Sequence, residues 1–114
     1  MGPSSVISIA KAGNRTIIVP QESLTYDNCE HLEATFKECI SQQRIHIILD
    51  CRAVHLMDSE ALELLVGMHD ETRKLGGTLK IVGLNEVCRD TLIATRLIYL
   101  DIHEDIHEAI RIGA

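Results

Sequence analysis

The chain has 114 residues, of which 46% are hydrophobic and 25% charged, as is usual for a soluble globular domain. Its formal net charge of −6 disfavours contact with nucleic-acid backbones and anionic membrane surfaces, and its aromatic content of 3% leaves few platforms for base stacking. We therefore expect one domain over residues 1–114 that binds no nucleic acid and does not insert into a membrane. No export signal is recognisable, so we expect a cytoplasmic protein. The cysteines (Cys29, Cys39, Cys51 and Cys88) lack C-x-x-C spacing, which predicts reduced thiols.

The N-terminal segment predicts an antiparallel hairpin. Residues 5–10 alternate weakly in polarity, as an edge strand does, and a Gly-Asn turn signal follows. Residues 15–19 are rich in β-branched side chains and stop at Pro20, which predicts the second strand. Thr25 is then the expected N-cap of a helix of about four turns. The buried face of this helix is predicted from the apolar positions Cys29, Leu32, Phe36, Cys39 and Ile40.

The middle of the chain predicts a central strand followed by a long helix. Residues 45–50 are almost continuously apolar, as expected of a strand that is covered on both faces. Ser59–Leu75 is predicted to be a helix, and Gly76-Gly77 supplies the residue type that tolerates a left-handed C-cap. The inner stripe of this helix is predicted to consist of Leu62, Leu65, Val66 and His69.

The C-terminal third continues the alternation of strands and helices. Residues 78–82 predict a strand, Asn85 is the expected cap of a helix that reaches about Arg96, and residues 97–100 predict a short strand. A last helix is predicted over residues 101–112. The order ββαβαβαβα indicates a single α/β domain with a mixed, mostly parallel sheet of four to five strands and about four helices.

One motif points to zinc chemistry. His103 to His107 fit H-E-x-x-H, which would place two imidazoles on one face of the last helix. However, Ile102, Ile106 and Ile110 define the buried face of that helix, so we interpret the two histidines as surface residues. A small zinc hydrolase is kept as an alternative that metal analysis would test. The sequence contains no Gly-rich phosphate loop, and we expect neither a metal nor a cofactor.

Nucleophilic catalysis would require a hydroxyl or thiol beside a positioned base. Ser59 stands four residues after His55, but nothing in the sequence pairs the two side chains. We therefore expect Ser59 to cap the helix that it begins, and we assign no catalytic residue. The Asp58-Ser59-Glu60 turn remains the expected site, because backbone N–H groups at a helix start are unpaired and the helix dipole favours negative charge there.

This turn resembles the STAS domain of bacterial anti-sigma-factor antagonists. The similarity begins with Leu49-Asp50, Met57-Asp58-Ser59 and Ala61-Leu62. It continues through residues 74–84 and ends in a Thr95-Arg96-Leu97 step, so it spans nearly the whole chain. The resemblance implies a STAS fold and a non-enzymatic regulator of transcription that binds an anti-sigma serine kinase or another signalling assembly.

The resemblance also implies where a partner binds and how binding is regulated. The partner-binding residues would be Asp58, Ser59, Glu60, Leu62 and Glu63. Glu60 stands at the position where the family carries its phospho-acceptor hydroxyl, so phosphorylation at Glu60 is impossible; Ser59 lies one position earlier than the usual acceptor. Ala61 replaces the family's glycine, and Thr25 replaces its aspartate. The alternative is a STAS subunit of an ABC-type lipid transport system.

Overall fold

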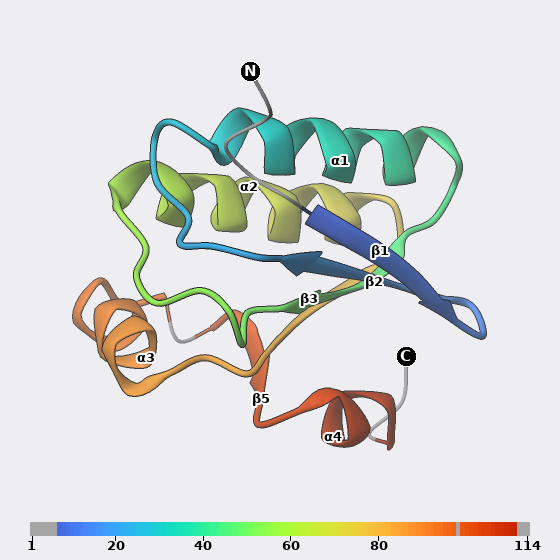
Figure 1. Cartoon of the computed structure of the whole chain (residues 1–114). Coiled ribbons are helices and arrows are strands. Elements are labelled where there is room, and N and C mark those ends of the chain that lie inside the picture. The colour runs from blue at the N-terminus through green and yellow to red at the C-terminus, as the bar shows by residue number, and fades with distance from the viewer. Residues whose placement is uncertain (1–6, 98, 112–114) are drawn as a thin grey trace.

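A computed structural model of the chain describes residues 7–97 and 99–111. It contains a five-stranded sheet in the order β1-β2-β3-β4-β5 (Figure 1). Helices connect the strands from β2 onwards, and a last helix follows β5. The elements in chain order are β1 (Ile7–Ala12), β2 (Arg15–Pro20), α1 (Cys29–Ser41), β3 (His46–Asp50), α2 (Ser59–Lys74), β4 (Thr78–Val82), α3 (Glu86–Ala94), β5 (Asp101–His103) and α4 (Ile106–Arg111).

The sheet is mixed and mostly parallel, as predicted. β1 and β2 form an antiparallel hairpin in which Ala12 pairs with Arg15, and Gly13 supplies the positive φ of +66° that the tight turn needs. β2, β3, β4 and β5 then run parallel to one another. Part of the predicted first strand, residues 5 and 6, lies outside the described residues. The parallel order places the carboxyl ends of β2 and β3 side by side at one edge of the sheet.

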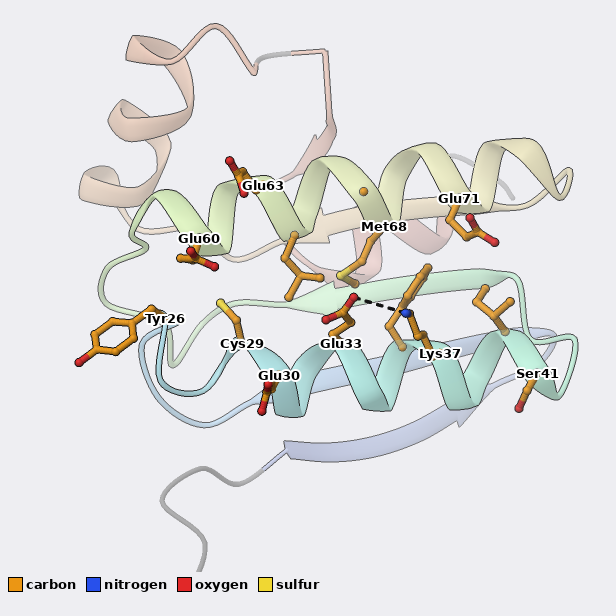
Figure 2. Close-up of a pocket in the computed structure, with 14 residues that line it drawn as sticks. Tyr26, Cys29, Glu30, Glu33, Lys37, Ser41, Glu60, Glu63, Met68 and Glu71 are labelled. Atoms are coloured by element: carbon orange, nitrogen blue, oxygen red, sulfur yellow. Dashed lines mark ion pairs between the residues drawn. The ribbon is translucent and has the colours of Figure 1, made fainter.

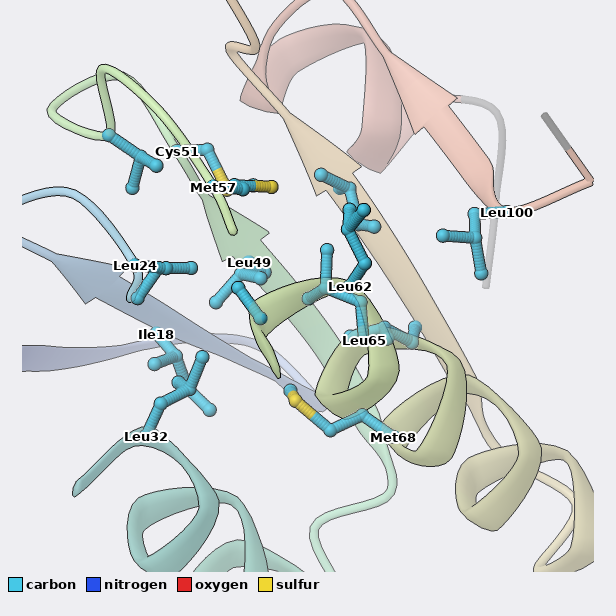
Figure 3. Packing of buried hydrophobic residues seen from close by; sticks show 14 of the residues in the cluster. Ile18, Leu24, Leu32, Leu49, Cys51, Met57, Leu62, Leu65, Met68 and Leu100 are labelled. Carbon is cyan, nitrogen blue, oxygen red and sulfur yellow. The ribbon is translucent and has the colours of Figure 1, made fainter. Parts of the chain in front are cut away.

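Two apolar clusters cover the two faces of the sheet. α1 and α2 lie against one face, where they form the larger cluster with the alternate side chains of the central strands; α3 adds Cys88 and Leu92 to this cluster (Figures 1 and 3). α4 lies against the opposite face, where Ala109 packs with Ile17, Ile48 and Val82. Because both faces of β3 are covered, its nearly continuous apolar sequence is explained.

The end of α2 follows the predicted glycine termination. Gly76 has a φ of +81° and its N–H donates to the carbonyl of Arg73 at 3.1 Å, while the N–H of Gly77 donates to the carbonyl of Thr72 at 2.7 Å. This pair of bonds is the Schellman arrangement. Gly77 also lies against the backbone, since an added Cβ would stand 2.0 Å from the carbonyl oxygen of Ile45. The turn is thereby pressed against the start of the central strand.

The predicted start of α1 was wrong. Thr25 does not cap a helix; α1 begins at Cys29, after Asn28, whose side chain makes no cap hydrogen bond. The Asn28 side chain is used instead to hold the preceding loop, as described below. The predicted apolar face of the helix is confirmed, because Cys29, Leu32 and Phe36 are buried.

The prediction for the C-terminal segment was also wrong. Residues 101–103 form β5, with Ile102 opposite Ile81 of β4, and only Ile106–Arg111 is helical. Among residues 97–100, position 98 lies outside the described residues and the other three are not in a strand; position 112 is also outside. His103 is therefore a buried strand residue and only His107 lies exposed on the helix, so the H-E-x-x-H residues do not share a helical face. The physical reason is the backbone pairing with β4, which the local sequence pattern does not contain.

A buried lysine connects the short helix α4 to the sheet. Lys80 of β4 is only 4% exposed, and its Nζ donates to the carbonyl of Ala109 at 2.8 Å. This carbonyl lies in the last turn of α4, where the helix dipole favours a cation. None of the described helices is both long enough and apolar enough to cross a lipid bilayer.

Candidate functional site

The start of α2 is fixed by Asp58. Its backbone is extended, with φ −97° and ψ −176°, and its Oδ1 accepts a hydrogen bond from the N–H of Ala61 at 3.0 Å. Asp58 is therefore the N-cap, and the prediction that Ser59 caps the helix was wrong. Ser59 and Glu60 are the first two helical residues, and both side chains are exposed.

The same carboxylate joins the two loops that follow β2 and β3. Oδ2 of Asp58 accepts a hydrogen bond from the N–H of Tyr26 at 2.7 Å, across 32 residues of sequence. Beneath this contact, Leu24 and Met57 form a parallel bridge: the N–H of Leu24 donates to the carbonyl of Leu56 at 3.1 Å, and the N–H of Asp58 donates to the carbonyl of Leu24 at 3.2 Å. The two loops form one hydrogen-bonded unit.

Side chains of the first loop complete this unit. The Asn28 side chain donates to the carbonyl of Ser23 at 2.6 Å and accepts from the N–H of Thr25 at 2.9 Å. The hydroxyl of Ser23 accepts from the N–H of Leu56 at 3.2 Å. These bonds present Tyr26 with 75% of its surface exposed, beside the start of α2. Sequence reasoning missed Tyr26, because only the long-range Leu24–Met57 bridge brings it to Asp58.

The five predicted partner-binding residues divide into two groups. Ser59, Glu60 and Glu63 are exposed and can contact another molecule. Leu62 is buried in the larger apolar cluster, and both carboxylate oxygens of Asp58 accept hydrogen bonds from the chain itself. Asp58 and Leu62 therefore hold the turn from within, and the accessible surface at the start of α2 consists of Ser59, Glu60, Glu63 and the added Tyr26.

A groove of about 770 Å³ runs along the surface between α1 and α2 (Figure 2). Tyr26 and Glu60 lie at one end of it, and Ser41 and Glu71 lie at the other. Its lining is acidic, and Lys37, the one cation among the described residues that line it, lies 3.5 Å from Glu33. The groove is therefore continuous with the exposed surface at the start of α2.

The acidic surroundings also act on the cysteine at the head of the groove. Burial, followed by the negative charge of Asp58 and Glu60, raises the pKa of the Cys29 thiol to about 11. Cys29 is thus a neutral thiol at physiological pH and a poor nucleophile. All four cysteines are buried and free, as predicted.

Within residues 7–97 and 99–111, no three His, Cys, Asp or Glu side chains are grouped so that they could hold a metal ion. His103 instead has its Nε2 2.8 Å from the carboxylate of Asp101 and its Nδ1 3.6 Å from that of Glu108. Our prediction that both histidines of the motif lie on the surface therefore holds for His107 alone.

A family model, the STAS domain, matches residues 7–109. The chain belongs to the STAS domain family. The match covers all the strands and nearly all of the described helices, and the sheet order, the N-terminal hairpin and the helices agree with the STAS fold.

Solved structures show the same STAS fold at low sequence identity. A candidate anti-sigma factor antagonist from Thermotoga maritima is 23% identical with a TM-score of 0.88, and the match covers 92% of each chain. An anti-sigma factor antagonist from Mycobacterium paratuberculosis is 15% identical with a TM-score of 0.85, over 95% of this chain and 92% of the other. The unphosphorylated SpoIIAA antagonist is 16% identical with a TM-score of 0.73, over 92% of this chain and 94% of the other. No curated protein sequence matches the chain significantly.

Proposed function

We propose that this STAS protein is a non-enzymatic regulator that binds an anti-sigma serine kinase, or a related signalling assembly, through the exposed surface at the start of α2. The observation that carries the proposal is the exposed Glu60 in the first turn of a helix whose start is held by Asp58. Tyr26 stands beside this turn and supplies an aromatic anchor of the kind that contributes strongly to protein interfaces.

The carboxylate of Glu60 makes the turn permanently acidic. A phosphate at such a position carries about −1.5 to −2 charges and three acceptor oxygens, whereas a carboxylate carries one charge and two oxygens. Solved STAS structures include SpoIIAA in its phosphorylated form and a serine-to-glutamate variant of RsbS from Moorella thermoacetica. These neighbours support the proposal, because the fold accommodates both a phosphoryl group and an introduced glutamate. Here the Glu60 carboxylate would permanently supply part of the negative charge that a phosphate would carry.

Phosphorylation assays test the lost acceptor. The protein is incubated with a purified anti-sigma serine kinase and labelled ATP, and incorporation is measured by gel and mass spectrometry. We expect no label on the wild type and clear labelling of Glu60→Ser, because only the variant has a hydroxyl at that position. Labelling of the wild type that disappears in Ser59→Ala would refute the lost-acceptor proposal and make Ser59 the acceptor.

Binding measurements test the surface itself. Calorimetric titration of the same kinase with Tyr26→Ala should weaken binding at least 10-fold, since Tyr26 is 75% exposed beside the turn. Tyr99→Ala is the matched control, because Tyr99 is 53% exposed and contacts His69 of α2 rather than the turn. Equal losses in the two variants would contradict the assignment. In a separate pull-down with this protein as bait, recovery of an ATP-binding-cassette transporter in place of a kinase would support the transport-subunit alternative.

A further inference from the structure

The groove between α1 and α2 has an apolar floor. Phe36 and Cys29 of α1 and Met68 of α2 are buried beneath it, and Leu64 is half-buried on its wall. Figure 2 shows the Met68 side chain between the two helices. Leu64 and Ile40, which also line the groove, are only half-buried and keep apolar surface accessible there, which favours apolar side chains from another molecule.

The rim of the groove is negatively charged on both sides. The described side chains that line the groove carry a formal net charge of −4, because five glutamates face a single lysine, Lys37. The glutamates are Glu30, Glu33, Glu60, Glu63 and Glu71. The Glu33–Lys37 pair at 3.5 Å bridges i and i+4 of α1, so the lysine does not neutralise the α2 side. An occupant complementary to this rim carries Lys or Arg on both flanks of an apolar stripe.

Gly67 provides a second, independent observation. It lies in the middle of α2, lines the groove and is exposed, yet a Cβ added there would meet no atom within 4 Å. Glycine destabilises a helix interior relative to alanine, and here neither φ nor internal packing requires it. A helix with no side chain at this point lets the backbone of another molecule approach closely. Such an approach explains a glycine that the fold itself does not require.

We propose that this groove binds a basic amphipathic helix of a partner protein. Both walls are helices whose backbone groups are internally bonded, so an added strand has no edge to pair with, whereas a helix can lay an apolar stripe between them. α1 has 13 residues, which at about 1.5 Å per residue gives room for roughly three turns of a bound helix. The proposal rests on the proposed protein-binding function and adds a second surface, continuous with the Glu60 turn, together with the chemistry of its occupant.

A designed peptide tests the groove directly. The probe is a fluorescein-labelled 14-residue peptide with Leu at i, i+3, i+4 and i+7 spacing and Lys or Arg elsewhere, titrated by fluorescence anisotropy. We expect saturable binding that weakens as salt is raised, at least 10-fold weaker binding of a scrambled peptide of the same composition, and no binding of the peptide with Glu in place of Lys and Arg. Equal binding of the scrambled peptide would overturn the proposal.

Variants locate the binding. Gly67→Leu places a side chain in the groove and should weaken peptide binding at least 10-fold, while Gly67→Ala should weaken it less and raise the melting temperature by about 2–4 °C. Glu71→Lys should weaken binding at least 5-fold, and Asp90→Lys, the same charge change on an exposed site of α3 outside the groove, less than 2-fold. Wild-type affinity in a folded Gly67→Leu protein, or equal effects of Glu71→Lys and Asp90→Lys, would overturn the proposal.

The kinase experiment separates this proposal from the preceding one. If the peptide fails to bind while the kinase binds in a Tyr26-dependent manner, the groove proposal falls and the proposed function stands. If the peptide binds in a Gly67-dependent manner while no kinase binds, the groove is supported and the kinase assignment falls.

Discussion

Two different replacements of Asp58 separate the contributions of its two hydrogen bonds to stability. Asp58→Ala removes the cap on Ala61, worth about 1 kcal/mol, and the charge-assisted hydrogen bond to Tyr26, worth about 1 kcal/mol more at this half-buried position. We therefore expect a loss of about 2 kcal/mol in the free energy of unfolding, or a decrease of about 6–8 °C in melting temperature for a domain of this size.

Asp58→Asn should cost about half as much. Asparagine caps helices as well as aspartate, but with its oxygen at the cap it turns an N–H₂ donor toward the N–H of Tyr26, so only the contact between the loops is lost. Urea unfolding followed by circular dichroism measures both values, with Asp90→Ala on α3 as a control expected within about 0.5 kcal/mol of wild type. Equal losses for the Ala and Asn variants, or no loss for Asp58→Ala, would refute the double role.

Three further predictions follow from the same structure. Iodoacetamide at pH 7.5 should alkylate Cys29 about 100-fold more slowly in the folded protein than in the urea-unfolded protein, as followed by peptide mass spectrometry. The reason is that raising the pKa from 9.0 to about 11 lowers the thiolate fraction about 100-fold. A similar rate in the two states would contradict the raised pKa. In urea unfolding, Gly77→Ala should lower the free energy of unfolding more than Gly76→Ala does. A Cβ at Gly77 overlaps the backbone of Ile45, whereas a Cβ at Gly76 meets no atom within 4 Å and costs only the strain of a positive φ, about 1–2 kcal/mol. The reverse order would contradict this account. Lys80→Met should remove hydrogen-exchange protection from α4 while α2 stays protected, because it deletes the bond to the last turn of α4; unchanged protection in α4 would show that this bond is dispensable.

The sequence predicted the elements whose signals are local. Residues 45–50 are almost continuously apolar, which fits a strand β3 that is covered on both faces. The glycine pair after α2 ends that helix through backbone bonds among neighbouring residues. Asn85 caps α3 as expected, accepting from the N–H of Cys88 at 2.8 Å. In each case the residues that determine the structure lie within one short window.

Two of the features that the sequence did not predict depend on contacts between distant parts of the chain. Ile102, Ile106 and Ile110 repeat every four residues, which imitates one helix, although Ile102 pairs with β4 and a new helix begins after Asp105. The signal that could have revealed the break is Asp105 itself, whose side chain accepts from the N–H of Glu108 at 2.9 Å as a cap does. Tyr26, by contrast, had no local signal at all, because its place in the site is determined by the loop after β3, through the Leu24–Met57 bridge and the Asp58 carboxylate.

The bridge between Leu24 and Met57 has a practical consequence for engineering this fold. The loops after β2 and β3 share a backbone pairing and the Asp58 contact, so neither keeps its shape without the other. A chimera that exchanges only the Asp58-Ser59-Glu60 turn with another STAS protein would receive an unsupported segment. Residues 21–28 and 51–60 therefore have to be exchanged together, as one cassette, for specificity to be transferred between relatives.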